Sequence, residues 1–269
     1  MFLNAKYGKI NMAQATMEYI RFGSGKKHLV MLPGLGDGLR TLKGTALPVA
    51  YMYRIFARDY TVWMLARKQP LETDCTTRTM AHDVKQAMDM LGIMQADIIG
   101  VSQGGMIAQW LALDSPAKVG RLVLAVTAPD SNETIKSLVT EWISMAENKD
   151  FKGLVTDNFE KSYTDLYLAR YRWLYPVLVP FAKPQDTQRF ILQAHSCLTH
   201  NALPYVEKIT RPTLVIGGRQ DKIVTFAASL QLAEKIPHSR LLVYDDYGHA
   251  LYEEAKDFNR QLLAFLQEK

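Results

Sequence analysis

The stretch that decides the fold covers residues 97–110 and reads DIIGVSQGGMIAQW. Its apolar run, Ile98–Val101, is typical of a short buried strand, and apolar side chains recur at helical spacing after it. Between the two stands GVSQG, residues 100–104, a Gly-x-Ser-x-Gly pattern. So sharp a turn needs neighbours almost without side chains, and it holds the serine hydroxyl clear of the sheet. The stretch predicts a nucleophile at Ser102, with a plain glycine-rich turn as the alternative.

Strands and helices alternate along the rest of the chain, outside residues 130–205. This alternation predicts an α/β fold whose mostly parallel sheet has helices on both faces. The apolar runs predict strands at Lys9–Met12, Thr16–Arg21, His28–Leu32, Tyr60–Leu65, Ile98–Val101, Arg121–Val126, Pro212–Gly218 and Arg240–Tyr244. The periodic segments predict helices at Ala46–Arg58, with Leu47 and Tyr51 on its buried stripe, and at Thr79–Leu91, Phe226–Ile236 and Glu253–Leu266.

Residues 130–205 differ in character, because they show helical periodicity and no convincing strand. We expect residues 1–129 and 206–269 to form the core domain and residues 130–205 to form a helical cap inserted into it. A first cap helix would be capped by Asp130 or Ser131, and others are expected at Phe151–Phe159, Thr164–Tyr175 and Thr187–Leu198. The aromatic candidates for substrate contact are Trp142, Tyr163, Tyr167 and Tyr171, with simple packing of the cap as the alternative for each ring.

A carboxylate and an imidazole follow two later strands. Asp221 comes just after the strand at 212–218, and His249 comes just after the last strand. The carboxyl ends of parallel strands share one edge of a sheet, so both side chains are expected near Ser102. A serine needs a base to take its proton, and that base needs a carboxylate to orient it. We therefore predict His249 as general base and acid and Asp221 as orienting acid, with Asp130 as the alternative acid.

A glycine-rich loop, LPGLGDG at residues 32–38, follows the strand at His28–Leu32. Backbone amides in such a loop can approach a ligand closely. Acyl transfer passes through an alkoxide, which two amide N–H groups can stabilise. We expect these donors to be the amides of Leu35 and Gln103. An ordinary strand-to-helix turn is the alternative for this loop.

Five motifs in this order resemble those of the α/β-hydrolase superfamily, and they extend over nearly the whole chain: LPGLGDG, GVSQGG, RLVLAVTAP, RPTLVIGGRQD and DDYGHA. The resemblance implies a mostly parallel eight-stranded sheet flanked by helices, with an inserted all-helical cap. Two departures stand out. Pro33-Gly34 stands where many members carry His-Gly, and residues 65–71, LARKQPL, replace an Asp-x-Arg-Gly-x-Gly-x-Ser segment.

The predicted chemistry is that of a serine hydrolase without metal or organic cofactor. We expect it to cleave carboxylic esters of small to medium apolar acyl groups through an acyl-enzyme. The nearest rival is hydrolysis of a carbon–carbon bond in a diketone, which members that resemble this chain perform with the same triad. A third alternative is a small-molecule receptor of the same fold with little turnover.

The composition of the chain bears on its binding partners and on its location in the cell. The net charge is +5, but the basic residues are scattered in pairs, so nucleic-acid binding has little support. Two cysteines, Cys75 and Cys197, argue for a reducing compartment. No run suits a signal peptide or a stable membrane insertion, so we expect a cytoplasmic protein, either a monomer or a homodimer. His195, Cys197 and His200 lack the spacing of a structural zinc site.

Overall fold

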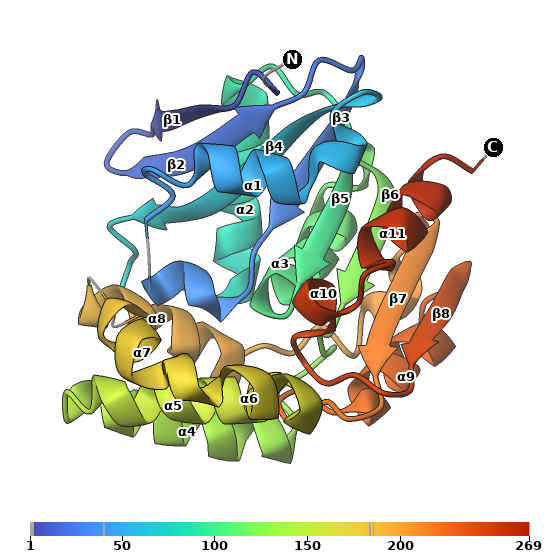
Figure 1. Cartoon of the computed structure of the whole chain (residues 1–269). Coiled ribbons are helices and arrows are strands. Elements are labelled where there is room, and N and C mark those ends of the chain that lie inside the picture. The colour runs from blue at the N-terminus through green and yellow to red at the C-terminus, as the bar shows by residue number, and fades with distance from the viewer. Residues whose placement is uncertain (1–2, 40, 183, 185, 269) are drawn as a thin grey trace.

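An eight-stranded sheet runs through the protein in the order β1-β2-β4-β3-β5-β6-β7-β8 (Figure 1). The computed structural model describes residues 3–39, 41–182, 184 and 186–268. β2 pairs antiparallel with both β1 and β4, and the other neighbours pair parallel, so the predicted mostly parallel α/β sheet is confirmed. The strands are β1 (Lys6–Asn11), β2 (Thr16–Phe22), β3 (Lys27–Leu32), β4 (Tyr60–Gln69), β5 (Ala96–Val101), β6 (Val119–Ala125), β7 (Thr213–Gly218) and β8 (Ser239–Tyr244).

Helices cover both faces of this sheet because strand side chains alternate between the faces. Ile98 of β5 packs in the cluster with α2, α3 and α9, and Ile99 packs in the cluster with α1 and α11 on the other face. Both isoleucines are almost completely buried. The helices are α1 (Ala46–Met52), α2 (Thr77–Met90), α3 (Gln103–Asp114), α9 (Phe226–Lys235), α10 (Leu251–Glu254) and α11 (Phe258–Leu266).

β4 and the helix expected at 46–58 do not end where the sequence predicted. β4 continues past Leu65 to Gln69, because its polar end still pairs with β2 through Thr16. The helix expected at 46–58 ends at Met52 and is followed by a short 3₁₀ turn. The side chains of Leu47 and Tyr51, expected to be buried, are 61% and 66% exposed, so the predicted stripe was wrong there.

The last predicted helix, 253–266, is two helices in the structure. α10 ends where Ala255 takes an extended backbone conformation, and α11 begins at Phe258. This break has a packing reason. Leu251 of α10 stays in the core beside the loop that carries His249, and α11 starts in a new direction to bury its own apolar face.

A layer of helices covers the carboxyl ends of the parallel strands, as Figure 1 shows. It lies between β6 and β7 in the chain. Asn132, and neither Asp130 nor Ser131, caps its first helix by accepting from the Ile135 N–H. The helix expected at 164–175 divides after Tyr171. The cap helices are α4 (Glu133–Glu147), α5 (Phe151–Ser162), α6 (Asp165–Tyr171), α7 (Tyr175–Ala182) and α8 (Thr187–Leu198).

Within the described ranges, none of the helices combines the length and the apolar character needed to span a bilayer.

Candidate active site

Ser102 stands on a tight turn between β5 and α3. Its backbone has φ 52° and ψ −120°, a conformation that costs a residue with a side chain about 1–3 kcal/mol. The neighbouring glycines permit this turn. A Cβ on Gly104 would lie 1.9 Å from the Leu32 carbonyl oxygen, and a Cβ on Gly100 would lie 2.5 Å from the Gly104 oxygen. The Gly-x-Ser-x-Gly pattern is therefore a steric requirement of this turn.

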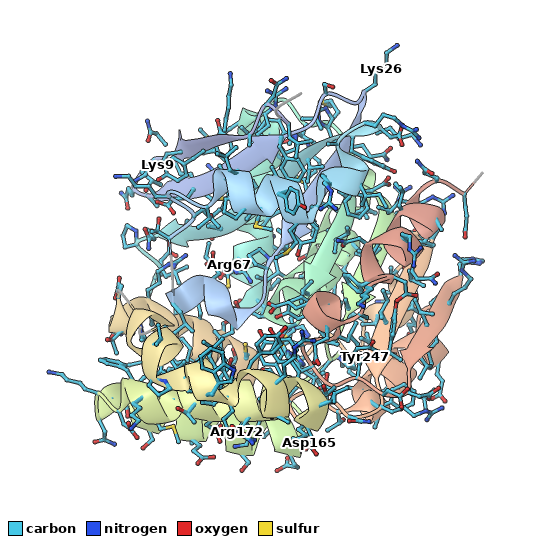
Figure 2. The ribbon with its side chains drawn as sticks, viewed as in Figure 1. Lys9, Lys26, Arg67, Asp165, Arg172 and Tyr247 are labelled. Atoms are coloured by element: carbon cyan, nitrogen blue, oxygen red, sulfur yellow. The ribbon has the colours of Figure 1, made fainter. Side chains whose placement is uncertain are left out.

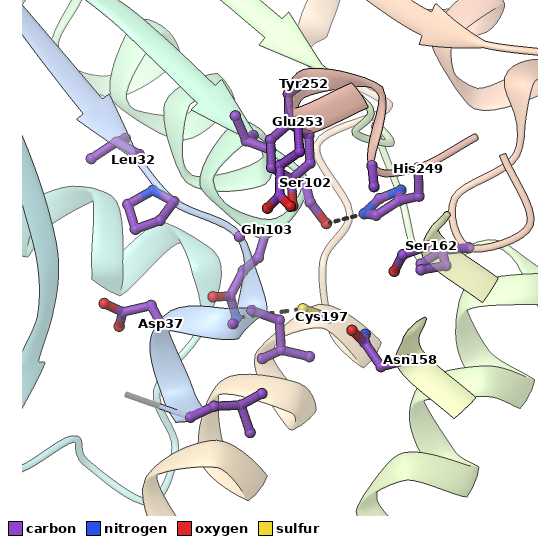
Figure 3. Close-up of a pocket in the computed structure, with 18 of the residues that line it drawn as sticks. Leu32, Asp37, Ser102, Gln103, Asn158, Ser162, Cys197, His249, Tyr252 and Glu253 are labelled. Carbon is purple, nitrogen blue, oxygen red and sulfur yellow. Dashed lines mark hydrogen bonds between the residues drawn. The ribbon is translucent and has the colours of Figure 1, made fainter. Parts of the chain in front are cut away.

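The structure brings Ser102, His249 and Asp221 into one hydrogen-bonded chain. His249 Nε2 lies 3.0 Å from Ser102 Oγ, and His249 Nδ1 lies 2.9 Å from Asp221 Oδ2 (Figure 3 draws the first contact). The imidazole and the carboxylate are both buried. Asp221 Oδ1 accepts from the N–H groups of Ile223 and Val224, at 2.8 and 3.0 Å, which fixes its orientation. The arrangement can move a proton from the serine to the imidazole.

Asp130, the alternative acid, lies elsewhere. It forms a β-bridge with Asn201 at the base of the cap. The carboxylate that contacts His249 is that of Asp221.

The two amides expected to hold an oxyanion lie at the starts of α3 and of a 3₁₀ turn, Leu35–Leu39. As the first residues of their helices, Gln103 and Leu35 have no intrahelical acceptor for their N–H groups. Each of these two N–H groups shares its peptide unit with a carbonyl oxygen that accepts a hydrogen bond. The Gly34 oxygen accepts from Asp37 N at 3.1 Å, and the Ser102 oxygen accepts from Thr127 Oγ1 at 2.7 Å. Such bonds orient and polarise the two N–H donors.

A cavity of about 840 Å³ opens in front of Ser102 between the sheet and the cap. Of the four candidate aromatics, Trp142 and Tyr163 line it, whereas Tyr167 and Tyr171 are not among its lining residues. Tyr163 and Tyr167 stack, and the rings of Tyr167 and Tyr171 are tilted by 45°, with ring centroids 4.4 Å apart in each pair. The cap wall is mainly apolar, and its aliphatic lining residues are Ile135, Val139, Leu154 and Val155.

Several polar lining residues were not foreseen from the sequence, among them two on α5 and two on α10. Asn158 and Ser162 are one helical turn apart on α5, and Figure 3 shows both on the cap side of the cavity. Across from them lie Tyr252 and Glu253 of α10, and Glu253 accepts a 2.5 Å hydrogen bond from Tyr163 Oη. The i, i+4 spacing of Asn158 and Ser162 was the available signal, but it does not reveal which way that face of α5 points.

A buried polar cluster lies behind the serine, where the core meets α8. Asp37 Oδ2 accepts from Arg189 Nη2 at 2.6 Å and from Gln193 Nε2 at 3.2 Å. Arg67 donates to Gln103 Oε1 at 2.9 Å, and Gln103 Nε2 donates to the Gln193 oxygen at 2.7 Å. Burial lowers the pKa of Arg67, and the nearby Asp37 carboxylate opposes that shift. The cluster connects the cap to the segments that carry the Leu35 and Gln103 amides.

The residues weighed as a metal site have other contacts. His200 Nδ1 lies 2.8 Å from Thr77 Oγ1, and Cys197 Sγ lies 3.4 Å from Gln103 Nε2. Burial raises the pKa of the Cys197 thiol to about 12, so this group that lines the cavity stays neutral. No group of three metal-ligating side chains occurs within the part of the chain that the structure describes.

Comparison with known proteins places this architecture in a family. The model of the α/β-hydrolase fold matches residues 27–256, which include Ser102, Asp221 and His249. The chain belongs to the α/β-hydrolase fold family. It is a hydrolase of that fold, as the resemblance of its motifs implied.

Curated relatives of this α/β-hydrolase cover almost its full length. A 2-hydroxy-6-oxononadienedioate/2-hydroxy-6-oxononatrienedioate hydrolase of Dechloromonas aromatica is 27% identical and covers 98% of this chain and 94% of its own. A hydrolase of the same name from Pseudomonas putida is 28% identical, covering 99% and 96%. Among solved structures, an α/β-hydrolase enzyme from a Medee basin deep-sea metagenome library superposes with a TM-score of 0.87 at 21% identity, covering 97% and 98%.

Proposed function

We propose that this protein hydrolyses a carbon–carbon bond next to a ketone, in a substrate whose acyl group is apolar. The observation that carries the proposal is the hydrogen-bonded series Ser102–His249–Asp221. Its serine faces a cavity that has an apolar cap wall and, apart from it, the polar residues Asn158 and Ser162. The two curated relatives support the bond type, because both are named as hydrolases of 2-hydroxy-6-oxo dienedioates. Hydrolysis of a carbon–carbon bond, which the sequence left open as an alternative, therefore has better support than ester hydrolysis.

The serine supplies the first half of the proposed reaction. Ser102 Oγ attacks the ketone carbonyl while His249 Nε2 takes its proton. The N–H groups of Leu35 and Gln103 hold the resulting oxyanion. The carbon–carbon bond then breaks, the leaving carbon takes the proton from His249, and the acyl group remains on Ser102. Water activated by His249 finally attacks the acyl-enzyme and releases the carboxylic acid.

The leaving carbon constrains the substrate. It can depart only if its electron pair is delocalised into a conjugated carbonyl. A 2-hydroxy-6-oxo-2,4-dienoate meets this condition once its enol proton has moved to carbon 5 to give the 2,6-dioxo-3-enoate tautomer. The leaving fragment is polar, so we assign it to the side of the cavity with Asn158 and Ser162, and we assign the acyl group to the apolar wall. A cavity of about 840 Å³ is within the range that accommodates small organic ligands.

Ester hydrolysis is the second candidate, and one observation favours it. Asp37 and Glu253 line the cavity, and among its described lining residues Lys43 is the one lysine or arginine. Such a lining suits a neutral ester better than the dicarboxylates in the relatives' names, since a buried carboxylate needs a cationic partner. For the same reason we propose a carbon–carbon substrate with an apolar 6-substituent in place of the second carboxylate.

A comparison of two substrate series tests the proposal. One series contains 2-hydroxy-6-oxo-2,4-dienoates with methyl, isopropyl or phenyl at carbon 6, alongside the nine-carbon dioate, and is followed by loss of dienolate absorbance. The other contains p-nitrophenyl acetate and butyrate. We expect kcat/KM for the apolar dienoates to exceed that for the esters and the dioate by about tenfold or more. Ser102→Ala should lower the turnover of the dienoates by at least about 10³-fold.

Other results would point to the alternatives. A higher kcat/KM for the esters than for the dienoates would show that the protein is an ester hydrolase. Tight binding of one small molecule without turnover would favour the receptor. If a fluorophosphonate fails to label Ser102 in the folded protein, the proposed nucleophile is wrong.

A further inference from the structure

Arg67 contacts the segments that carry both oxyanion donors. It lies on β4, and Figure 2 places it between the sheet and the cap layer. Its side chain is almost completely buried. Arg67 Nη2 donates to the Pro33 carbonyl oxygen at 2.5 Å and to Gln103 Oε1 at 2.9 Å. Its backbone N–H also donates to Asp37 Oδ2 at 3.2 Å. One residue thus reaches two segments that are far apart in the sequence, the loop at residues 32–38 and the start of α3.

These contacts surround the proposed oxyanion hole on both sides. Pro33 lies two residues before Leu35, and Asp37 holds the Gly34 carbonyl of the peptide that contains the Leu35 N–H. Gln103 carries the second amide. We propose that Arg67 is a positioning residue that fixes the separation and orientation of the Leu35 and Gln103 N–H donors. This inference rests on the proposed serine chemistry, but it does not depend on which substrate is cleaved.

The charges in the buried cluster also support this role for Arg67. Two guanidinium groups, Arg67 and Arg189, share this cluster with one carboxylate, Asp37. The Arg189 guanidinium pairs directly with that carboxylate, whereas the recorded partners of the Arg67 side chain are the neutral oxygens of Pro33 and Gln103. A positive charge in a buried position behind the oxyanion donors favours negative charge developing in front of them.

The kinetics of a folded Arg67 variant should separate positioning from a structural role. Removing one member of a buried charged network costs stability in either case, because its partners are left without a donor. Arg67→Met keeps the length of the side chain and removes its charge and its donors. If Arg67 only supported the fold, this variant would lose stability and substrate affinity together. If it positions the donors, the folded variant reacts more slowly with little change in KM.

The experiment measures the rate constant for labelling of Ser102 by a fluorophosphonate, together with kcat, KM and thermal unfolding. The variants are Arg67→Met, Gln103→Met, which keeps the backbone N–H, and the double variant. The matched control is Lys68→Met, which removes the adjacent cation of β4, one that pairs with Glu72 and Asp83 outside the cluster. We expect Arg67→Met to slow labelling and kcat about tenfold, less than loss of a direct donor. KM should stay within about twofold, and Lys68→Met should label like the wild type.

The double variant tests whether the two residues act through one contact. If they do, the factor by which labelling slows in the double variant should be smaller than the product of the factors for the two single variants. Multiplicative effects, or wild-type labelling by folded Arg67→Met, would overturn the inference. If Arg67→Met does not fold, wild-type labelling by Gln103→Met would overturn it and slower labelling would support it. Labelling of wild type without turnover of dienoates would overturn the proposed substrate alone.

Discussion

Exchanging Asp221 for asparagine should reverse the hydrogen bond that prepares His249. Asp221 Oδ1 already accepts from the N–H groups of Ile223 and Val224. In Asp221→Asn, the side-chain oxygen is expected to stay with these two donors, because its amide nitrogen cannot accept from them. The NH₂ group then faces His249 Nδ1, where the carboxylate oxygen lies at 2.9 Å in the wild type. A donor in that position requires Nδ1 to act as acceptor.

The consequence for the rate follows from the tautomer. With Nδ1 as acceptor, the imidazole proton sits on Nε2, which lies 3.0 Å from Ser102 Oγ. Nε2 then donates to the serine and cannot take its proton. In serine proteases the equivalent exchange lowers kcat by about 10⁴-fold, or about 5 kcal/mol of transition-state stabilisation. We expect a loss of that size here, with little change in thermal stability because both bonds to the Asp221 loop remain.

The assay is fluorophosphonate labelling of Ser102 together with kcat on the best substrate. Asp130→Asn is the matched control, since it makes the same chemical change at the alternative acid and should leave both rates unchanged. A loss smaller than about tenfold in folded Asp221→Asn would refute the tautomer argument. A large loss in Asp130→Asn would mean that the orienting acid has been assigned wrongly.

Three further changes should separate binding, packing and pH effects. Trp142→Ala removes a buried cap ring and should cost about 3–5 kcal/mol of unfolding free energy while shifting preference toward bulkier 6-substituents, as measured by denaturant unfolding and kcat/KM. Asn158→Leu and Ser162→Ala should each raise KM for dienoates about tenfold and leave KM for p-nitrophenyl acetate unchanged; equal effects on both substrates would argue against a polar subsite. Burial lowers the pKa of His200 to about 3, so its contribution to stability is complete above the unfolded-state pKa of 6.5 and is lost as the pH falls toward 3. Wild type should therefore lose about 1.6 kcal/mol more than His200→Gln between pH 6.5 and 5 in urea unfolding, and parallel pH profiles would refute this.

The sheet could be predicted because its strands are short apolar runs between clear turns. Seven of the eight predicted strands lie within a few residues of the observed bounds, and β4 is the exception at its carboxyl end. Its last residues, including Arg67 and Lys68, are charged and look like a loop in the sequence. They remain in the strand because β2 supplies backbone partners, and no local pattern shows that pairing.

The cap shows a second limit of prediction from sequence, which concerns the side chains that reach the cavity. Tyr163, Tyr167 and Tyr171 are spaced four apart, so the sequence suggests one helical face. In the structure, Tyr163 follows the end of α5, and the other two rings belong to α6. The three rings contact one another in sequence, but Tyr163 alone of the three lines the cavity. Spacing predicts which side chains lie close together, whereas the packing of the cap on the core decides which of them reach the substrate.

The positions of the polar groups suggest that rate and substrate choice have separate determinants. The residues that hold the Leu35 and Gln103 amides, the proposed oxyanion donors, lie on β4 and in the 3₁₀ turn at Leu35–Leu39. The candidate substrate contacts of the cap lie on α4 and α5. α8 belongs to the first set, because the Gln193 oxygen and Ser196 Oγ both accept from Gln103 Nε2. Substitutions in α4 and α5 should therefore alter KM and selectivity while Ser102 still labels at the wild-type rate, whereas substitutions at the α8 contacts should slow the labelling itself.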